Sequence, residues 1–378
     1  MPRTPIYLAA LYLLLPSISF AEEPPAFARY PDPVAEYLQQ LHQRVQAPFA
    51  FRESFPGGFD AWKTAARSRL EQLLGLDTIR RHVGSTTPKV SLGEPIQEEG
   101  YQRMLGSIET EPHVTIPFWL LVPDDIEQKR PLVVCAHGHD ADGWNSYAGV
   151  FQDDKHREKI VDRHGDVGVQ AVRRGYIALV PATRGLAAVT AIPDLKKRHG
   201  DRPCRAQVMH CLLAGRTAIG ERVWDTQRLL DWALESLPQV DDSRVAMLGN
   251  SGGGVLTVYM AALDDRLKVS VPSCSFSSYT SASGFIFHCD CCVVPRAQSE
   301  LGDFPDIGGL AAPRGLLAVH GRKDGLHSAP DVEAAMARVK SIFKHAGAAD
   351  QFEFTWGDEG HKFYPEIMWP FIERKLAE

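Results

Sequence analysis

After residue 21, the sequence lacks any apolar run long enough to cross a membrane. Internal repeats and long low-complexity tracts are also absent, which excludes repeat architectures. A strong excess of one charge is missing as well. The net charge of −6 over 378 residues gives no reason to expect nucleic acid or an anionic membrane as a partner. With 44% hydrophobic and 23% charged residues, the composition is that of an ordinary globular chain of one large or two smaller domains.

The N-terminus carries the one conspicuous apolar run, at residues 6–15, with a basic residue before it. Ser19 and Ala21 are small residues at the −3 and −1 positions of a cleavage site after Ala21. Because the run is too short to span a bilayer, it predicts a secretory signal peptide over residues 1–21. The alternatives are an uncleaved anchor or a short buried helix. No cysteine follows the predicted cut, so we expect no lipoprotein anchor and a secreted or periplasmic mature chain without membrane attachment.

The cysteines are few and odd in number, so at least one thiol has no partner within the chain. Export would make disulfides chemically possible. In "HCDCC" (288–292), three cysteines stand too close together for the usual two-plus-two spacing of zinc ligands, and no second cluster matches them. We therefore expect a structural role or a disulfide there, with metal binding as the alternative, and we predict no metal and no cofactor. The seven cysteines are Cys135, Cys204, Cys211, Cys274, Cys289, Cys291 and Cys292, of which Cys204 and Cys211 could pair across a short loop.

Two segments precede the main body of the chain. In residues 22–90, "VAEYLQQLHQRV" and "FDAWKTAARSRLEQLLGL" have apolar residues at helical spacing, which predicts an N-terminal helical extension. The main domain then covers residues 91–378. It opens with "YQRMLGSIET" and "VTIPFWLLVP", which predict two strands of a hairpin.

From residue 131 onward, short apolar strands alternate with helices. Strands such as "PLVVCAHG", "RVAMLGNSGGG" and "GLLAVHGRKDG" are unbroken apolar runs, typical of strands that are buried on both faces. The alternation predicts an α/β fold with a mostly parallel central sheet and helices on both faces. In such sheets, functional groups gather at the C-terminal ends of the strands. Three long connections, near 139–170, 185–220 and 276–312, are expected to form the walls of a site.

The stretch "GNSGGG" (249–254) places one serine among four glycines between a predicted strand and a predicted helix. A serine hydroxyl is a poor nucleophile unless it is held at a sharp turn beside a base. Small residues two positions before and after Ser251 allow such a turn, and the following helix points its N-terminal dipole at a developing oxyanion. A glycine-rich turn or phosphate loop is the alternative, but no lysine follows, which argues against a P-loop. The motif predicts Ser251 as a nucleophile.

A base and an orienting acid must follow Ser251. His361 in "WGDEGHKFY" comes just after the last predicted strand, whereas His320 is expected to be packed in a strand and His345 to cap a helix. Asp324, in the exit turn of the preceding strand, would hold one imidazole tautomer and stabilise the imidazolium. A turn-forming Asp-Gly is its alternative role. The other candidate acids are Asp303, Asp306 and Asp358.

Backbone donors and substrate contacts complete the predicted site. The oxyanion would be stabilised by the N–H groups of Gly252 and His139, while His137 is expected to be structural. Arg184, which follows the strand end "PAT", is a candidate substrate contact, although it could instead brace a loop or lie at the surface. Trp224 could line a pocket or belong to the core.

In the order and content of these motifs, the chain resembles the α/β-hydrolase superfamily. The motifs are "AHGHDADG", "ATRG", "GNSGGG", "HGRKD" and "DEGH". More narrowly, the chain resembles secreted bacterial acetyl xylan esterases and dienelactone-hydrolase-like esterases over about residues 95–378. In that group "HGH" precedes a long insert, and "GERVWDTQRLLD" leads to the serine turn between strand and helix, the elbow "GNSGGG". A cysteine-bearing stretch precedes "LAAPRGLLAVHG". The resemblance implies hydrolysis of a carboxylic ester through an acyl-enzyme on Ser251, with His361 moving the proton and no cofactor.

Three functions are therefore open. The first is an esterase acting on an acylated carbohydrate or another small ester. The second is a serine peptidase of the prolyl-oligopeptidase type. Such enzymes carry a large N-terminal propeller, which about seventy helical residues cannot supply. The third is a non-catalytic binding protein on a hydrolase scaffold. Loss of the serine, acid or histidine would indicate the third, and all three candidates are present.

Overall fold

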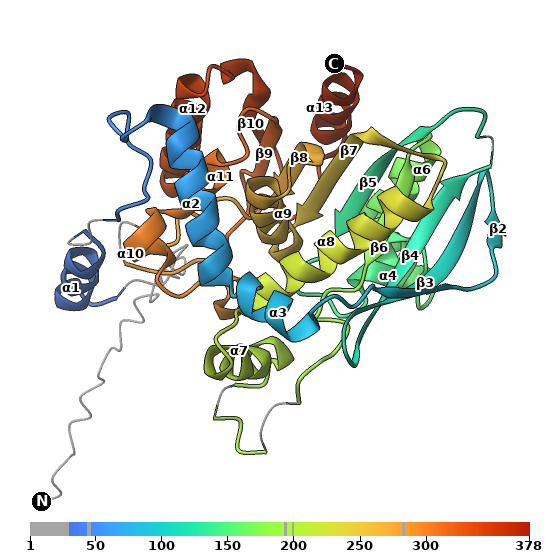
Figure 1. Ribbon diagram of the computed structural model, residues 1–378, viewed down its shortest axis with the longest axis horizontal. Coiled ribbons are helices and arrows are strands. Elements are labelled where there is room, and N and C mark those ends of the chain that lie inside the picture. Colours follow the sequence, from blue (N-terminus) through green and yellow to red (C-terminus); the bar gives the residue numbers. More distant parts are fainter. Residues whose placement is uncertain (1–29, 44–46, 125, 193–194, 199, 282–283) are drawn as a thin grey trace, which may run out of the picture.

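The computed structural model describes residues 30–378 apart from 44–46, 125, 193–194, 199 and 282–283 (Figure 1). The predicted signal peptide lies outside these residues. Within them, no helix has both the length and the apolarity that crossing a membrane requires.

One ten-stranded sheet runs through the molecule, in the order β1-β3-β4-β6-β5-β7-β8-β9-β10, with β2 paired to β3. The six neighbouring strands β6, β5, β7, β8, β9 and β10 pair in parallel. Strands β1 to β4 add an antiparallel edge, which includes the predicted hairpin β3–β4. The predicted mostly parallel sheet is confirmed. The bounds are β1 Lys89–Leu92, β2 Ile96–Glu98, β3 Tyr101–Glu111, β4 Val114–Pro123, β5 Arg130–Ala136, β6 Ile177–Pro181, β7 Val240–Asn250, β8 Leu267–Ser273, β9 Gly315–Gly321 and β10 Phe352–Gly357.

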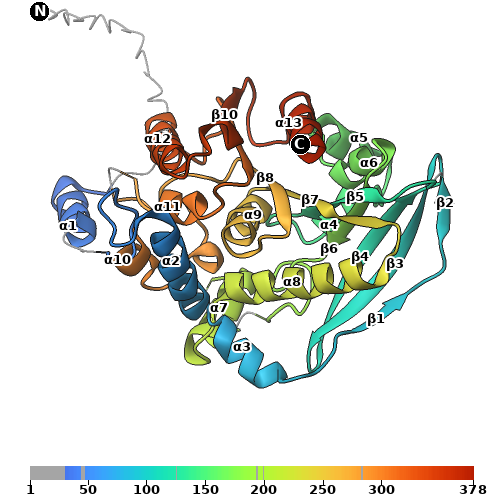
Figure 2. The same ribbon diagram turned by 45° about the horizontal axis from the view of Figure 1, so that its top comes forward.

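Helices cover both faces of this sheet, with α6 and α13 on one side and α8 on the other (Figure 2). The longer helices follow the predicted segments, and the long connections fold into short helices. The bounds are α1 Asp32–Gln43, α2 Gly58–Leu74, α3 Leu76–Val83, α4 Gly143–Tyr147, α5 Asp154–Asp162, α6 Val167–Arg173, α7 Pro203–Leu213, α8 Ala218–Ser236, α9 Gly252–Leu263, α10 Ala297–Leu301, α11 Phe304–Gly309, α12 Ala329–His345 and α13 Pro365–Ala377, with 3-10 turns η1 Asp290–Cys292 and η2 Ala349–Gln351.

Strand β5 shows why its sequence is apolar without a break. Leu132 and Val134 point into the core beneath α8 and α9, whereas Val133 and Cys135 point into the core beneath α6 and α13. All four side chains are fully buried. Because successive side chains of a strand face opposite sides, a strand covered on both faces needs apolar residues at every position.

The N-terminal helices belong to the same core as the sheet. Trp62, Leu70 and Leu74 of α2 are fully buried and pack in one cluster with residues of α8 and α9. The ammonium group of Lys63 donates to the carbonyl oxygen of Ala312 at 2.6 Å. Burying a large aromatic or leucine side chain contributes about 1.5–3 kcal/mol, so this extension stabilises the main domain.

His137 joins two strand ends at the carboxyl edge of the sheet. Its Nδ1–H donates to the carbonyl of Gly138 at 2.9 Å, and its Nε2 accepts the N–H of Thr183 at 2.8 Å. The ring has no exposed surface, and burial lowers the pKa of His137 to about 4. A neutral imidazole therefore ties the loop after β5 to the loop after β6, which is the structural role expected for it.

We predict that His137→Phe destabilises the fold and flattens its pH dependence. The Thr183 N–H would lose its acceptor inside the core, which costs about 1–3 kcal/mol at pH 7. In the unfolded chain histidine titrates near pH 6.5, so the unfolded state takes up the proton first as the pH falls. The contribution of His137 is thus complete above pH 6.5 and is lost as the pH falls toward 4, with about 2 kcal/mol gone at pH 5. Urea unfolding at pH 7 and pH 5 tests this, and an equal loss of stability in both proteins between these pH values would contradict it.

Candidate active site

Ser251 lies in a strained turn between β7 and α9. Its φ of 57° and ψ of −124° fall in a region that residues other than glycine rarely adopt. The neighbouring glycines are required by close approach of the main chain. A Cβ atom on Gly253 would lie 2.0 Å from the carbonyl oxygen of Ala136, and one on Gly249 would lie 2.4 Å from the carbonyl carbon of Gly253. The glycines therefore let the elbow fold tightly enough to hold the serine clear of its own backbone.

The predicted acid and base form a direct hydrogen bond. His361 Nδ1–H donates to Asp324 Oδ2 at 2.7 Å, and the N–H of Leu326 donates to Oδ1 of the same carboxylate at 3.0 Å. Burial by itself would raise the pKa of Asp324, but the hydrogen bond and charge of His361 outweigh it and lower that pKa. The carboxylate thus remains ionised and fixes the tautomer that carries its proton on Nδ1, which leaves His361 Nε2 as a proton acceptor.

Two cavities meet at Ser251. The smaller, of about 260 Å³, is lined by Ser251 and His361 together with His139 and Tyr147. The larger, of about 590 Å³, is also lined by Ser251 and His139, and its other walls include Phe285, Phe287 and Leu326. Arg163 and Arg202 also reach these cavities. All three long connections thus contribute walls, as predicted, and the structure brings Ser251, Asp324 and His361 to one edge of the sheet.

The two predicted oxyanion donors are neighbours beside the serine. Gly252 is the first residue of α9, so its N–H has no partner within the helix. The His139 ring lies 2.8 Å from the position that a Cβ atom on Gly252 would occupy. A Cβ atom on Gly138 would lie 3.0 Å from the Cβ atom of Ser251. Within the described part of the chain, the N–H of His139 makes no hydrogen bond to another backbone group. These N–H groups are therefore placed where an oxyanion hole needs donors, and that role stays a prediction.

Comparison with known proteins agrees with this geometry. Residues 163–283 match the sequence model of the acetyl xylan esterase family AXE1. YtaP of Bacillus subtilis (strain 168), provisionally named a hydrolase, is 25% identical over 306 residues, which are 78% of this chain and 92% of YtaP. A Bacteroides fragilis NCTC 9343 structure, provisionally assigned as an acetyl xylan esterase, superposes with a TM-score of 0.68 at 16% identity, covering 92% of this chain and 96% of its own. A glucuronoyl esterase from Solibacter usitatus superposes with a TM-score of 0.62 at 15% identity, covering 88% and 97%.

The chain has the α/β-hydrolase fold. The elbow, the strand order and the structural similarities settle the fold, and the family match agrees with the predicted likeness to acetyl xylan esterases. The match to the acetyl xylan esterase model also supports the predicted enzyme class, a carboxylic ester hydrolase.

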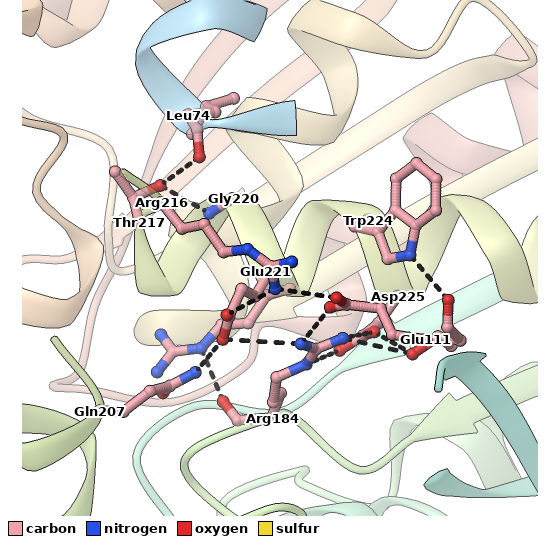
Figure 3. Close-up of polar contacts among 12 residues, drawn as sticks. Leu74, Glu111, Arg184, Gln207, Arg216, Thr217, Gly220, Glu221, Trp224 and Asp225 are labelled. Atoms are coloured by element: carbon pink, nitrogen blue, oxygen red, sulfur yellow. Dashed lines mark hydrogen bonds and ion pairs between the residues drawn. The ribbon is translucent and has the colours of Figure 1, made fainter. Parts of the chain in front are cut away.

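The structure corrects the two predicted substrate contacts of this α/β-hydrolase. Arg184 is 3% exposed, and its guanidinium donates to Glu111 at 2.5 Å and, through Nε, to Asp225 at 2.8 Å (Figure 3). Trp224 is buried on α8, with its indole N–H donating to the carbonyl of Thr110 at 2.9 Å. Neither residue lines a cavity beside Ser251. A guanidinium committed to buried carboxylates braces the loop after β6 and is unavailable to a substrate.

The other candidate acids have structural positions. Asp303 and Asp306 form a capping box at the start of α11, where Asp303 accepts the N–H of Tyr279 and of Phe304. Asp358 is exposed. Only Asp324, among the four candidates, contacts His361.

One group of side chains was not anticipated as a group. His139, Cys204, Cys289 and Cys291 come from three separate connections, yet their ligating atoms all lie within 4.8 Å of one another. All seven cysteines are free thiols, so the suggested pairing of Cys204 with Cys211 does not occur. The sequence pointed to two members, Cys289 and Cys291 in "HCDCC", where metal binding was the alternative. It did not link them to His139 and Cys204, because the four residues are spread over about 150 residues.

We predict that the strained backbone at Ser251 lowers the stability of the fold. A left-handed or related strained backbone costs a residue with a side chain about 1–3 kcal/mol, and glycine avoids this cost. Both Ser251→Gly and Ser251→Ala lack the hydroxyl. The free energy of unfolding of Ser251→Gly should nevertheless exceed that of Ser251→Ala by about 1 kcal/mol, so Ser251→Gly should also unfold at a higher temperature. Paired thermal or urea unfolding checks this. A Ser251→Ala protein at least as stable as Ser251→Gly would show that the turn carries no strain.

Proposed function

We propose that this protein is a serine esterase that removes acetyl groups from carbohydrate through an acyl-enzyme. The hydrogen bond between His361 Nδ1 and Asp324, beside a strained serine that lines the same cavity, carries the proposal. With Nδ1–H held by the carboxylate, His361 Nε2 can remove the proton of Ser251 as its oxygen attacks the ester carbonyl. The same nitrogen then returns the proton to the departing alcohol. Water releases the acid in a second, equivalent cycle.

Electrostatics support charge development at Ser251. The N–H groups of Gly252 and His139 would donate to the oxyanion, and the dipole of α9 favours negative charge at its N-terminus. The buried, ionised Asp324 stabilises the imidazolium that forms during attack. These features supply a base, a nucleophile and anion stabilisation, which together are sufficient for acyl transfer without a cofactor.

The substrate class rests on the match to the acetyl xylan esterase family and on the cavity walls. The larger cavity is lined by Phe285 and Phe287 together with the polar residues Arg202 and Ser275. Apolar rings with a few polar groups are suited to one face of a sugar and its hydroxyls. The carbohydrate portion would therefore occupy this cavity.

We expect Ser251→Ala to abolish ester hydrolysis, because the substitution removes the proposed nucleophile. The measurement is kcat/KM on short-chain p-nitrophenyl esters and acetate release from acetylated xylan, using the mature chain. Ser251→Ala should lower kcat/KM by about 10⁴-fold or more and Asp324→Asn by about 10³–10⁴-fold. Ser277→Ala is the matched control, because Ser277 is a buried serine whose hydroxyl has no partner among the residues that the structure describes.

The competing functions give different results in the same assay. Cleavage of a prolyl amide with inert esters would identify a peptidase. Unchanged ester rates in Ser251→Ala would reject the mechanism, and binding of acetylated xylan without turnover by the wild type would indicate a non-catalytic protein. A fluorophosphonate probe should label Ser251 in the wild type and nothing in Ser251→Ala.

We also propose that the protein is exported, on the strength of the apolar run and the small residues before the predicted cut. Expressed at full length in a bacterium, it should be recovered outside the cytoplasm with Glu22 as its first residue. Ala21→Trp should block processing, because a bulky residue does not fit the −1 position. Cell fractionation and intact mass provide the measurement, and an unprocessed cytoplasmic chain would contradict the proposal.

A further inference from the structure

Four side chains with metal-binding atoms converge beside the elbow. His139 Nε2 lies 3.2 Å from Cys291 Sγ, and Cys291 Sγ lies 3.7 Å from Cys289 Sγ. Cys204, at the start of α7, completes the group, and all four ligating atoms lie within 4.8 Å of one another. Three sulfurs and one imidazole nitrogen form the ligand set of a structural Cys₃His zinc site.

The spacing fits a shared metal better than a disulfide. A tetrahedral zinc ion with Zn–S bonds of about 2.3 Å separates its sulfurs by about 3.8 Å. The Cys289–Cys291 separation of 3.7 Å matches that distance, whereas a disulfide needs about 2.05 Å. A disulfide would also leave the third sulfur and the imidazole without an equivalent role.

Buried charge beside the cluster points the same way. Arg222 is 2% exposed, and its side chain donates to the carbonyl of Arg184 and, at 3.2 Å, to Cys291 Sγ. Its second terminal nitrogen has no partner among the described residues. A buried cation without a carboxylate needs other negative charge nearby, because isolated buried charge is costly. Zinc with three thiolates and one neutral imidazole carries one net negative charge, which Arg222 would balance.

Groups around the cluster are also arranged to orient its ligands. Asp290 Oδ1 accepts the N–H of Cys291 at 3.0 Å, and Arg205 pairs with the other oxygen of Asp290. Such outer contacts fix the orientation of ligating residues in metal sites. On metal binding, each of the three thiols would release its proton to solvent.

We propose that His139, Cys204, Cys289 and Cys291 bind one Zn²⁺ ion in a closed, four-coordinate structural site. The ion would join three connections, namely the loop after β5, the start of α7 and the turn η1. His139 and Cys289 also line the cavities at Ser251, so the ion would hold the walls of the active site together. With four protein ligands, it has no open position and takes no direct part in the reaction.

Metal content is the test, and it requires no ester substrate, so its result is independent of the proposed function. The full-length processed protein, purified without chelators or an affinity tag, should contain about one zinc per chain by inductively coupled plasma mass spectrometry. Cys204→Ser, Cys291→Ser and His139→Ala should each bind zinc at least about 10-fold more weakly in competition with a chromogenic chelator. Cys211→Ser, the same substitution further along α7, is the matched control and should retain the ion.

A second measurement keeps the proposal testable if a ligand variant fails to fold. The wild-type protein is unfolded in a denaturant that contains a chelator and a thiol-alkylating reagent but no reductant. All seven cysteines should then be alkylated. A disulfide among Cys204, Cys289 and Cys291 would overturn the proposal, as would a metal-free wild type. Iron in place of zinc, or full zinc occupancy in every ligand variant, would overturn it equally.

Discussion

A contact between two main chains fixes the geometry of this α/β-hydrolase. At the end of β5, the carbonyl oxygen of Ala136 faces Gly253 at the start of α9 with no room for a side chain between them. This contact presses the loop after β5 against the elbow and places His139 beside Gly252. The Asp324–His361 pair reaches the same edge because β8, β9 and β10 follow β7 in the sheet and all run parallel to it. A strained serine is tolerated because packing on both sides over-determines its position.

Buried charge organises the region between the sheet and the long connections. Arg184 pairs with Glu111 and Asp225 (Figure 3). Arg222, one turn before Thr226 on α8, links the Arg184 backbone to the cysteine cluster. Such networks are costly to break, because removal of one partner leaves an uncompensated buried charge. Residues that look like ligand-binding groups in the sequence are thus part of the scaffold that shapes the site.

The sheet and the central triad candidates were predictable for physical reasons. Strands buried on both faces have unbroken apolar sequences, and parallel strands deliver the residues after them to one edge. The short helices of the long connections were not predictable. Helix α5, for example, buries none of its side chains, so it has no apolar periodicity to detect. The clustering of His139 with Cys204 and Cys291 was equally hidden, because it depends on how three connections fold against one another.

The partition of the site at Ser251 has a consequence for how such an enzyme diversifies. The two fragments of an ester cleaved there would occupy the two cavities, which share Ser251 and His139 and are otherwise lined by different residues. Residues 137–165 shape one compartment, while residues 285–292 and 325–327 shape the other. Mutations that alter preference for the alcohol could therefore accumulate without changing preference for the acid, and new substrates could be gained one half at a time.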